Sequence, residues 1–249
     1  MHFLIIACTY LLFFISPAQA IIGQSEDVSH VKSQLVMVLR EGGGVCSGVV
    51  VSLQVVLTAA HCVGEKPTSV RVHFKNNDGS PALITPRDVV RHHGYRADAI
   101  QTRTRSVDLA LVHLSTPLPA DFEAAQLSDV VPLKDTPLLV VGFGVTHEGS
   151  MEGVGQLNGA ILQTIMPYGA STLLVWANSL DQKPTGACQG DSGGAIFVGD
   201  AVVAITSWSS GSHNKKCGKL TQGILLKDQK DWVNTTVALW GHRAFWVSY

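Results

Sequence analysis

Three short motifs in this sequence carry the residue types needed for nucleophilic catalysis. His61 ends an apolar run and directly precedes a cysteine, Asp108 opens a second apolar run, and Ser192 lies in the glycine-rich segment 190–194. A serine hydroxyl becomes a strong nucleophile only when a base takes its proton, and histidine is the usual base because it titrates near neutral pH. A carboxylate on the far ring nitrogen fixes the tautomer of that histidine. Together the motifs predict acyl transfer through Ser192.

The glycines around Ser192 have a predicted role of their own. They permit a tight turn that points backbone N–H groups inward, where those of Gly190 and Ser192 can hold a developing oxyanion. Taken singly, each motif also has a structural interpretation: His61 as a structural or surface histidine, Asp108 as a turn former, and 190–194 as an ordinary turn. Their occurrence together in one chain, in this order, favours catalysis.

Composition limits both the fold and the partners. The chain has 249 residues, of which 46% are hydrophobic and 15% are charged, so it can build a sizeable core and is not intrinsically disordered. Lys and Arg total 18 against 19 Asp and Glu, a formal net charge of −1. Because binding to phosphate backbones needs a clear basic excess, nucleic acid is not expected as a partner.

Short apolar runs bounded by turn residues dominate the chain and predict an all-β barrel or sandwich. The predicted strands are 34–39, 45–51, 55–57, 70–74, 109–114, 138–141, 157–164, 173–177, 194–198 and 201–207. Residues 227–239 have mixed helical spacing and predict a C-terminal helix. The stretch 117–137 contains prolines and predicts the connection between two β halves.

The first twenty residues predict a secretory signal peptide. They contain no Asp, Glu, Lys or Arg, and their apolar run 3–15 ends before Pro17 and a small-residue cleavage site at 18–20. An uncleaved membrane anchor is the alternative interpretation. Cleavage would leave Ile21 as the first residue of a secreted protein, or of a periplasmic one in a bacterium, with no membrane contact afterwards.

Four cysteines remain after residue 20, at positions 46, 62, 188 and 217. An even number of cysteines in an exported chain predicts two disulfides. Their spacing leaves all three possible pairings open.

The sequence resembles the chymotrypsin/trypsin-like serine proteases along the whole of residues 21–249. The matching segments are 21–23, Cys46, 58–62, 92–95, 108–111, 188–194, Ser207 and Trp208. The resemblance implies one domain of two six-stranded antiparallel β-barrels with a C-terminal helix, and an active site between the barrels. It implies that His61 is the general base, Asp108 its orienting acid and Ser192 the nucleophile. It also implies the disulfides Cys46–Cys62 and Cys188–Cys217.

In this family a freed N-terminal amine pairs with the acid that precedes the serine. The resemblance therefore implies an ion pair between Ile21 and Asp191 that organises the oxyanion turn. Because signal cleavage itself would expose Ile21, we expect that no propeptide exists. The alternative interpretation of Asp191 is a simple turn cap.

The family resemblance also bears on which peptide bonds are cut. The residue six positions before the nucleophile forms the base of the primary pocket, and here it is Gly186, where a trypsin-type enzyme has Asp. A buried cationic side chain would lack a partner there, so we expect an apolar preference at P1, the residue before the scissile bond. Ser207, Trp208 and Ser209 resemble the strand that pairs with substrate, and Gly218 resembles the opposite wall.

Other features of the sequence are expected to be structural. His213, Lys215 and Lys216 form a basic cluster that we interpret as a solvated loop rather than a contact for substrate charge. Too few carboxylates stand near Asn76 and Asp78 for a calcium site, and we expect neither a metal nor a cofactor.

The leading hypothesis is therefore a secreted, monomeric serine endopeptidase that acts on proteins or peptides and is open to protein inhibitors. Two alternatives are a catalytically inactive relative that binds proteins, and a hydrolase of esters or other acyl groups with the same triad.

Overall fold

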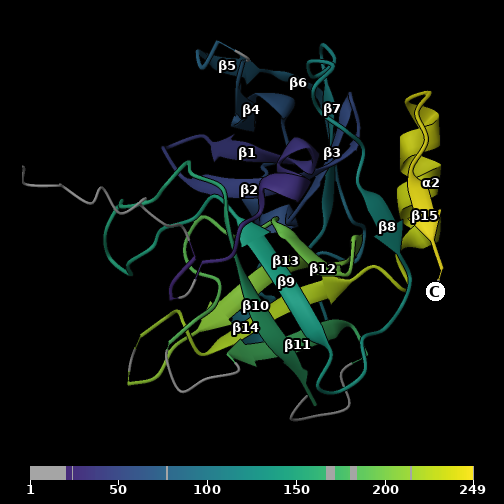
Figure 1. The fold of residues 1–249 in the computed structure, drawn as a ribbon. Helices are drawn as coiled ribbons and strands as arrows, with labels where there is room; N and C mark the ends of the chain where they lie inside the picture. Colours follow the sequence, from purple (N-terminus) through teal and green to yellow (C-terminus); the bar gives the residue numbers. More distant parts are fainter. Residues whose placement is uncertain are drawn as a thin grey trace, which may run out of the picture.

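The structure is a computed structural model that describes residues 21–23, 25–76, 78–166, 172–179, 184–213 and 215–248. The predicted signal peptide, residues 1–20, lies outside the described residues. Two β-sheets account for most of the described chain, one above the other in Figure 1, with a C-terminal helix along one side.

The first sheet has seven strands, all antiparallel, in the order β5-β4-β1-β2-β3-β7-β6. Alternation along β4 places Val70, Val72 and Phe74 inward and their neighbours outward, as the two-residue period of a strand requires. The strands are β1 (Leu35–Arg40), β2 (Val45–Ser52), β3 (Val55–Thr58), β4 (Val70–Lys75), β5 (Pro81–Ile84), β6 (Pro86–Arg91) and β7 (Ala110–Leu114).

The second sheet follows the order β12-β9-β10-β11-β14-β13-β8-β15, and an additional pairing of β12 with β13 closes six of its strands into a barrel. The short strands β8 and β15 lie outside this barrel and pair in parallel. The strands are β8 (Gln126–Ser128), β9 (Pro137–Gly142), β10 (Asn158–Ile165), β11 (Leu174–Ser179), β12 (Ala195–Val198), β13 (Ala201–Ser210), β14 (Leu220–Leu225) and β15 (Phe245–Val247).

The two-barrel, all-β architecture predicted from the sequence is confirmed, with one difference in detail. Within the described residues the first sheet stays open, because its edge strands β5 and β6 do not pair. The segment between β7 and β9 crosses from the first sheet to the second, and its strand β8 already belongs to the second sheet.

Helical segments are short. The C-terminal helix α2 (Lys230–Leu239) lies beside β7 and buries Val233, Thr236 and Val237 (Figure 1). It starts three residues later than predicted, because a turn from Gln229 N–H to the Leu226 carbonyl precedes it. The remaining segments are α1 (Ala99–Thr102) and the 3-10 turns η1 (Ser29–Gln34), η2 (Ala60–Cys62) and η3 (Pro67–Ser69).

A continuous apolar core joins the two sheets. Leu57 and Leu111 of the first sheet belong to the same buried cluster as Phe197, Ile205 and Ile224 of the second. Because protein cores pack at high density, this shared core fixes the position of one sheet relative to the other. Loops of both sheets therefore face each other in a defined geometry.

Candidate active site

His61 and Asp108 lie side by side because they flank paired strands. Thr58, at the end of β3, pairs with Ala110, at the start of antiparallel β7. The residue after one strand and the residue before the other therefore meet at the same edge. His61 Nδ1 lies 2.7 Å from Asp108 Oδ2, and the backbone N–H of His61 donates to Asp108 Oδ1 at 2.9 Å. The carboxylate thus holds both the ring and the backbone of the histidine.

A third hydrogen bond to this carboxylate comes from the other sheet. The register between β13 and β14 shifts between Thr206 and Trp208, so Ser207 occupies a bulge. Bulges re-aim a side chain that regular pairing would direct elsewhere. Ser207 Oγ donates to Asp108 Oδ2 at 2.6 Å. The sequence predicted Ser207 only as part of the substrate-pairing strand.

These contacts decide the charge of Asp108. Burial disfavours its ionised form, but the hydrogen bonds and charge of His61, with the hydrogen bond from Ser207, outweigh burial and hold the pKa of this carboxyl below its usual value. Asp108 is therefore ionised at neutral pH. The His61 side chain is 34% exposed, so its ring bridges the buried carboxylate and the solvent-facing cleft.

The turn that carries Ser192 is locked between the two sheets. The carbonyl of Ser192 accepts from the backbone N–H of Ser47 at 2.7 Å. Gly193 has φ of +84°, and a Cβ there would lie 2.1 Å from Thr58 Oγ1 and 2.2 Å from the Ser47 carbonyl. Only glycine fits this close approach, so the glycine-rich sequence of the turn has a steric cause.

Ser47 is a site residue that sequence reasoning missed. It lies on β2 beside Cys46 and is fully buried. Its Oγ donates to the Gly190 carbonyl at 2.9 Å and accepts from the backbone N–H of Phe143 at 2.9 Å. The first sheet thereby fixes the peptide that follows Gly190, whose N–H group belongs to the predicted oxyanion turn. The cysteine beside it gave no sign of this contact.

Asp191 is buried beneath the same turn. Its carboxylate accepts from the backbone N–H groups of Gly144 at 2.9 Å and Cys188 at 2.8 Å. Burial raises its pKa to about 7, against the lowering effect of these two bonds. No basic group pairs with it within the described residues. The expected ion pair with Ile21 is not formed in this structure, in which the chain continues before Ile21.

One cleft of about 1190 Å³ contains all three predicted catalytic residues, His61, Asp108 and Ser192. The predicted substrate-pairing residues Ser207, Trp208 and Ser209 also line it, whereas Gly186 and Gly218 do not. Gly186 instead exchanges two backbone hydrogen bonds with Ile22. A separate groove of about 850 Å³, between η1, β4 and the segment 143–158, holds none of the triad residues.

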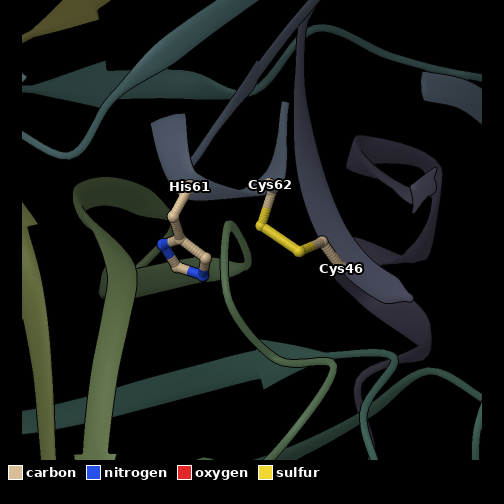
Figure 2. A group of neighbouring side chains, drawn as sticks. All are labelled: Cys46, His61 and Cys62. Carbon is tan, nitrogen blue, oxygen red and sulfur yellow. A yellow bond between two sulfur atoms is a disulfide. The ribbon is translucent and has the colours of Figure 1, made fainter. Parts of the chain in front are cut away.

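Both disulfides are the pairs that the family resemblance implies, Cys46–Cys62 and Cys188–Cys217. Figure 2 shows His61 and Cys62 on the same short turn, with Cys46 reaching across from β2. The possible metal-ligand atoms of these three residues lie within 4.8 Å of one another. The sulfur atoms are bonded to each other and are not thiolates, so they do not make a metal site in this structure.

A pair of β-barrels with a histidine, a buried carboxylate and a serine turn in the cleft between them defines a class of serine endopeptidases. The sequence profile of the trypsin family matches residues 21–233, and the chain belongs to this family.

Among the curated relatives, Trypsin epsilon of Drosophila erecta is 28% identical over 77% of this chain and 78% of its own length. Trypsin iota of Drosophila melanogaster is 31% identical over 66% of this chain and 68% of its own length. The bacterial Trypsin of Saccharopolyspora erythraea is 27% identical over 76% of this chain and 86% of its own.

Among solved structures, neuropsin, a serine protease expressed in the limbic system of mouse brain, superimposes with a TM-score of 0.71. The match covers 85% of this chain and 97% of neuropsin at 21% identity, which supports the fold. No helix among the described residues is both long and apolar enough to cross a membrane.

Proposed function

We propose that this protein is a secreted serine endopeptidase in which His61, Asp108 and Ser192 form the catalytic triad. The observation that carries this proposal is the 2.7 Å contact between His61 Nδ1 and Asp108 Oδ2 in the cleft that Ser192 also lines. The hydrogen bond leaves Nε2 of the ring as the atom that can accept a proton.

The proposed reaction has two halves. Ser192 Oγ attacks the carbonyl carbon of the scissile bond while its proton passes to His61 Nε2, and Asp108 stabilises the imidazolium that forms. The backbone N–H groups of Gly190 and Ser192 stabilise the oxyanion. His61 then gives the proton to the leaving amine, and an acyl-enzyme remains. Water, deprotonated by His61, hydrolyses the acyl-enzyme by the same steps in reverse order.

We infer that P1 is not a basic residue, in contrast to the specificity that the relatives' name suggests. Gly186 stands where a trypsin-type enzyme has its Asp, and it offers no side chain. Asp108, committed to the triad, is the one carboxylate among the described residues that line the cleft. A Lys or Arg at P1 would lack a partner, whereas an apolar side chain would not need one.

Export and activation are proposed to be one event. Two disulfides fit an oxidising compartment, and cleavage after residue 20 would free the amine of Ile21. Ile21 is 1% exposed and has φ of +66°, a conformation that is costly for a β-branched residue because Cβ meets the preceding carbonyl. A free N-terminus has no preceding carbonyl. We therefore propose that the freed amine pairs with Asp191.

An N-terminal extension is expected to lower activity. Two added alanines before Ile21 should reduce kcat/KM about a hundredfold relative to the chain that starts at Ile21. Breaking a buried ion pair costs several kcal/mol, and each 1.4 kcal/mol is worth a factor of ten. Hydrolysis of one peptide by both forms is the measurement. Equal activity of the two forms would contradict the activation proposal.

Stability should report the same event. Without an amine partner, folded Asp191 keeps a proton to about pH 7, whereas the unfolded chain releases it near pH 3.8. The extended form should therefore lose stability as pH rises through this interval. The form that starts at Ile21 should not show this loss, because the amine stabilises the carboxylate.

A cleavage map tests the proposed function directly. The chain starting at Ile21 would be given a diverse peptide mixture, and the cut sites would be read by mass spectrometry. A fluorophosphonate probe, which acylates activated serines, should modify Ser192. Cuts after apolar residues are expected, and cuts after Lys or Arg would overturn the inference about P1. Probe labelling without peptide cleavage would favour an esterase, and neither result would favour an inactive binding protein.

The enzyme is expected to act as a monomer, and a protein inhibitor would have to enter this cleft. Gel filtration of the form that starts at Ile21 would report its oligomeric state.

A further inference from the structure

The cleft around Ser192 has two walls that come from different sheets. One wall is the segment 95–106 after β6, which contains α1, and the other is the end of β13 with the loop that follows it. Five exposed cationic residues line these walls: Arg96, Arg103 and Arg105 on the first, and Lys215 and Lys216 on the second. The cleft therefore holds five of the chain's 18 Lys and Arg residues.

These cations are not neutralised by the protein. Within the described residues none of the five side chains makes an ion pair. Two acids lie close in the sequence or structure. Asp98 precedes α1, and the Glu148 carboxylate accepts from the backbone N–H of Lys216 at 2.9 Å. Neither acid lines the cleft, whose one carboxylate, Asp108, is bound to His61 and Ser207.

We propose that the cleft selects peptide substrates with Asp or Glu beside the scissile bond. This inference rests on the proposed peptidase function and names its substrate class. Like charges gathered in a cleft focus the field and attract ligands of opposite sign, both in the encounter and in the bound state.

The loop of Lys215 and Lys216 was expected from sequence to be merely solvated. The structure places it opposite a second cationic segment that is more than a hundred residues away in sequence. A solvated loop explains a charge cluster on one wall, but it does not account for unpaired cations on both walls of one cleft. The overall net charge of −1 shows that this excess is local.

The first test compares matched peptides. A peptide cut by the enzyme would be synthesised with Asp, Asn or Lys at each of the four positions on either side of the scissile bond. The Asp peptides should have kcat/KM about tenfold above their Asn counterparts at low ionic strength, at the positions that face the cationic walls. This ratio should shrink in 0.5 M salt, because salt screens exposed charges.

Variants assign the preference to each wall. Arg103→Gln with Arg105→Gln, and separately Lys215→Gln with Lys216→Gln, should each lower the Asp-to-Asn ratio about three- to fivefold, at different positions of the peptide. The control removes two exposed cations outside the cleft, Arg87→Gln with Lys227→Gln, and should leave the ratio unchanged.

A binding measurement separates this inference from the proposed function. Fluorescence anisotropy of labelled Asp and Asn peptides with the Ser192→Ala protein needs no turnover, and the Asp peptide should bind about tenfold more tightly at low salt. Equal binding and equal hydrolysis of the two peptides would overturn the charge preference while leaving the peptidase in place. A ratio that the control variant lowers as much as the cleft variants do would also overturn it. Absence of all cleavage, with tighter binding of the Asp peptide, would contradict only the proposed function.

Discussion

Replacing Ser192 by alanine is expected to lower kcat/KM about a million-fold, the largest effect of any single substitution in this chain. Alanine has no atom that can attack the carbonyl carbon, so the acyl-enzyme cannot form. The turn should remain intact, because its contacts use the backbone: the Ser192 carbonyl accepts from Ser47 N–H, and Gly193 N–H donates to the Thr206 carbonyl. The measurement is hydrolysis of the best peptide from the cleavage map.

Folding and contamination must be excluded for this variant. Ser115→Ala removes an exposed serine outside the cleft and should leave kcat/KM unchanged. The Ser192→Ala protein should also bind peptide as well as the unmodified chain does, since the cleft walls are untouched. Retention of more than a hundredth of the activity would assign the nucleophile to another residue and reject the proposed triad.

Much of the fold was predictable because the strands that form the barrels are apolar and short. All ten predicted strands are present, most with boundaries shifted by one residue and β13 extended by three, since Ala201–Ser210 continues past residue 207. Strands β5, β6, β8, β14 and β15 were missed. Their sequences lack a clear apolar period: β6 contains Arg87 and Asp88, and β14 contains Gln222 and Gly223. Pairing with neighbours overrides weak local preference there.

The site was predictable only in the residues that carry a motif. His61, Asp108 and Ser192 were named from sequence, and the structure brings them into one cleft. The hydrogen bonds of Ser47 and Ser207 could not be foreseen, since each joins segments about a hundred residues or more apart. Ser47 reaches Gly190 across the two sheets, and Ser207 reaches Asp108 from a bulge whose position depends on strand register. Such contacts are products of tertiary structure.

Replacing Asp108 by asparagine is expected to lower kcat/KM about ten thousand-fold. The carboxylate accepts three hydrogen bonds: the backbone N–H of His61 at Oδ1, and both His61 Nδ1 and Ser207 Oγ at Oδ2. An asparagine has one oxygen and one NH₂ group, so its oxygen will accept from the backbone N–H and its NH₂ will face the ring. Nδ1 must then act as an acceptor, and the ring proton moves to Nε2. In this tautomer His61 cannot take the proton of Ser192.

Two comparisons distinguish this tautomer switch from a loss of stability. Ser207→Ala removes one hydrogen bond to Asp108 but leaves the tautomer unchanged, so it should lower kcat/KM only about tenfold, the worth of one hydrogen bond to a charged group. Proton NMR should detect the His61 Nδ1–H, bound to the carboxylate, in the original protein and in Ser207→Ala but not in Asp108→Asn. If Asp108→Asn kept the Nδ1–H signal and most of its activity, Asp108 would be a structural partner of the His61 backbone. The orienting acid of the triad would then have to be sought elsewhere. The expected pair of results, a large kinetic loss together with loss of the Nδ1–H signal, is one that a merely structural carboxylate would not produce.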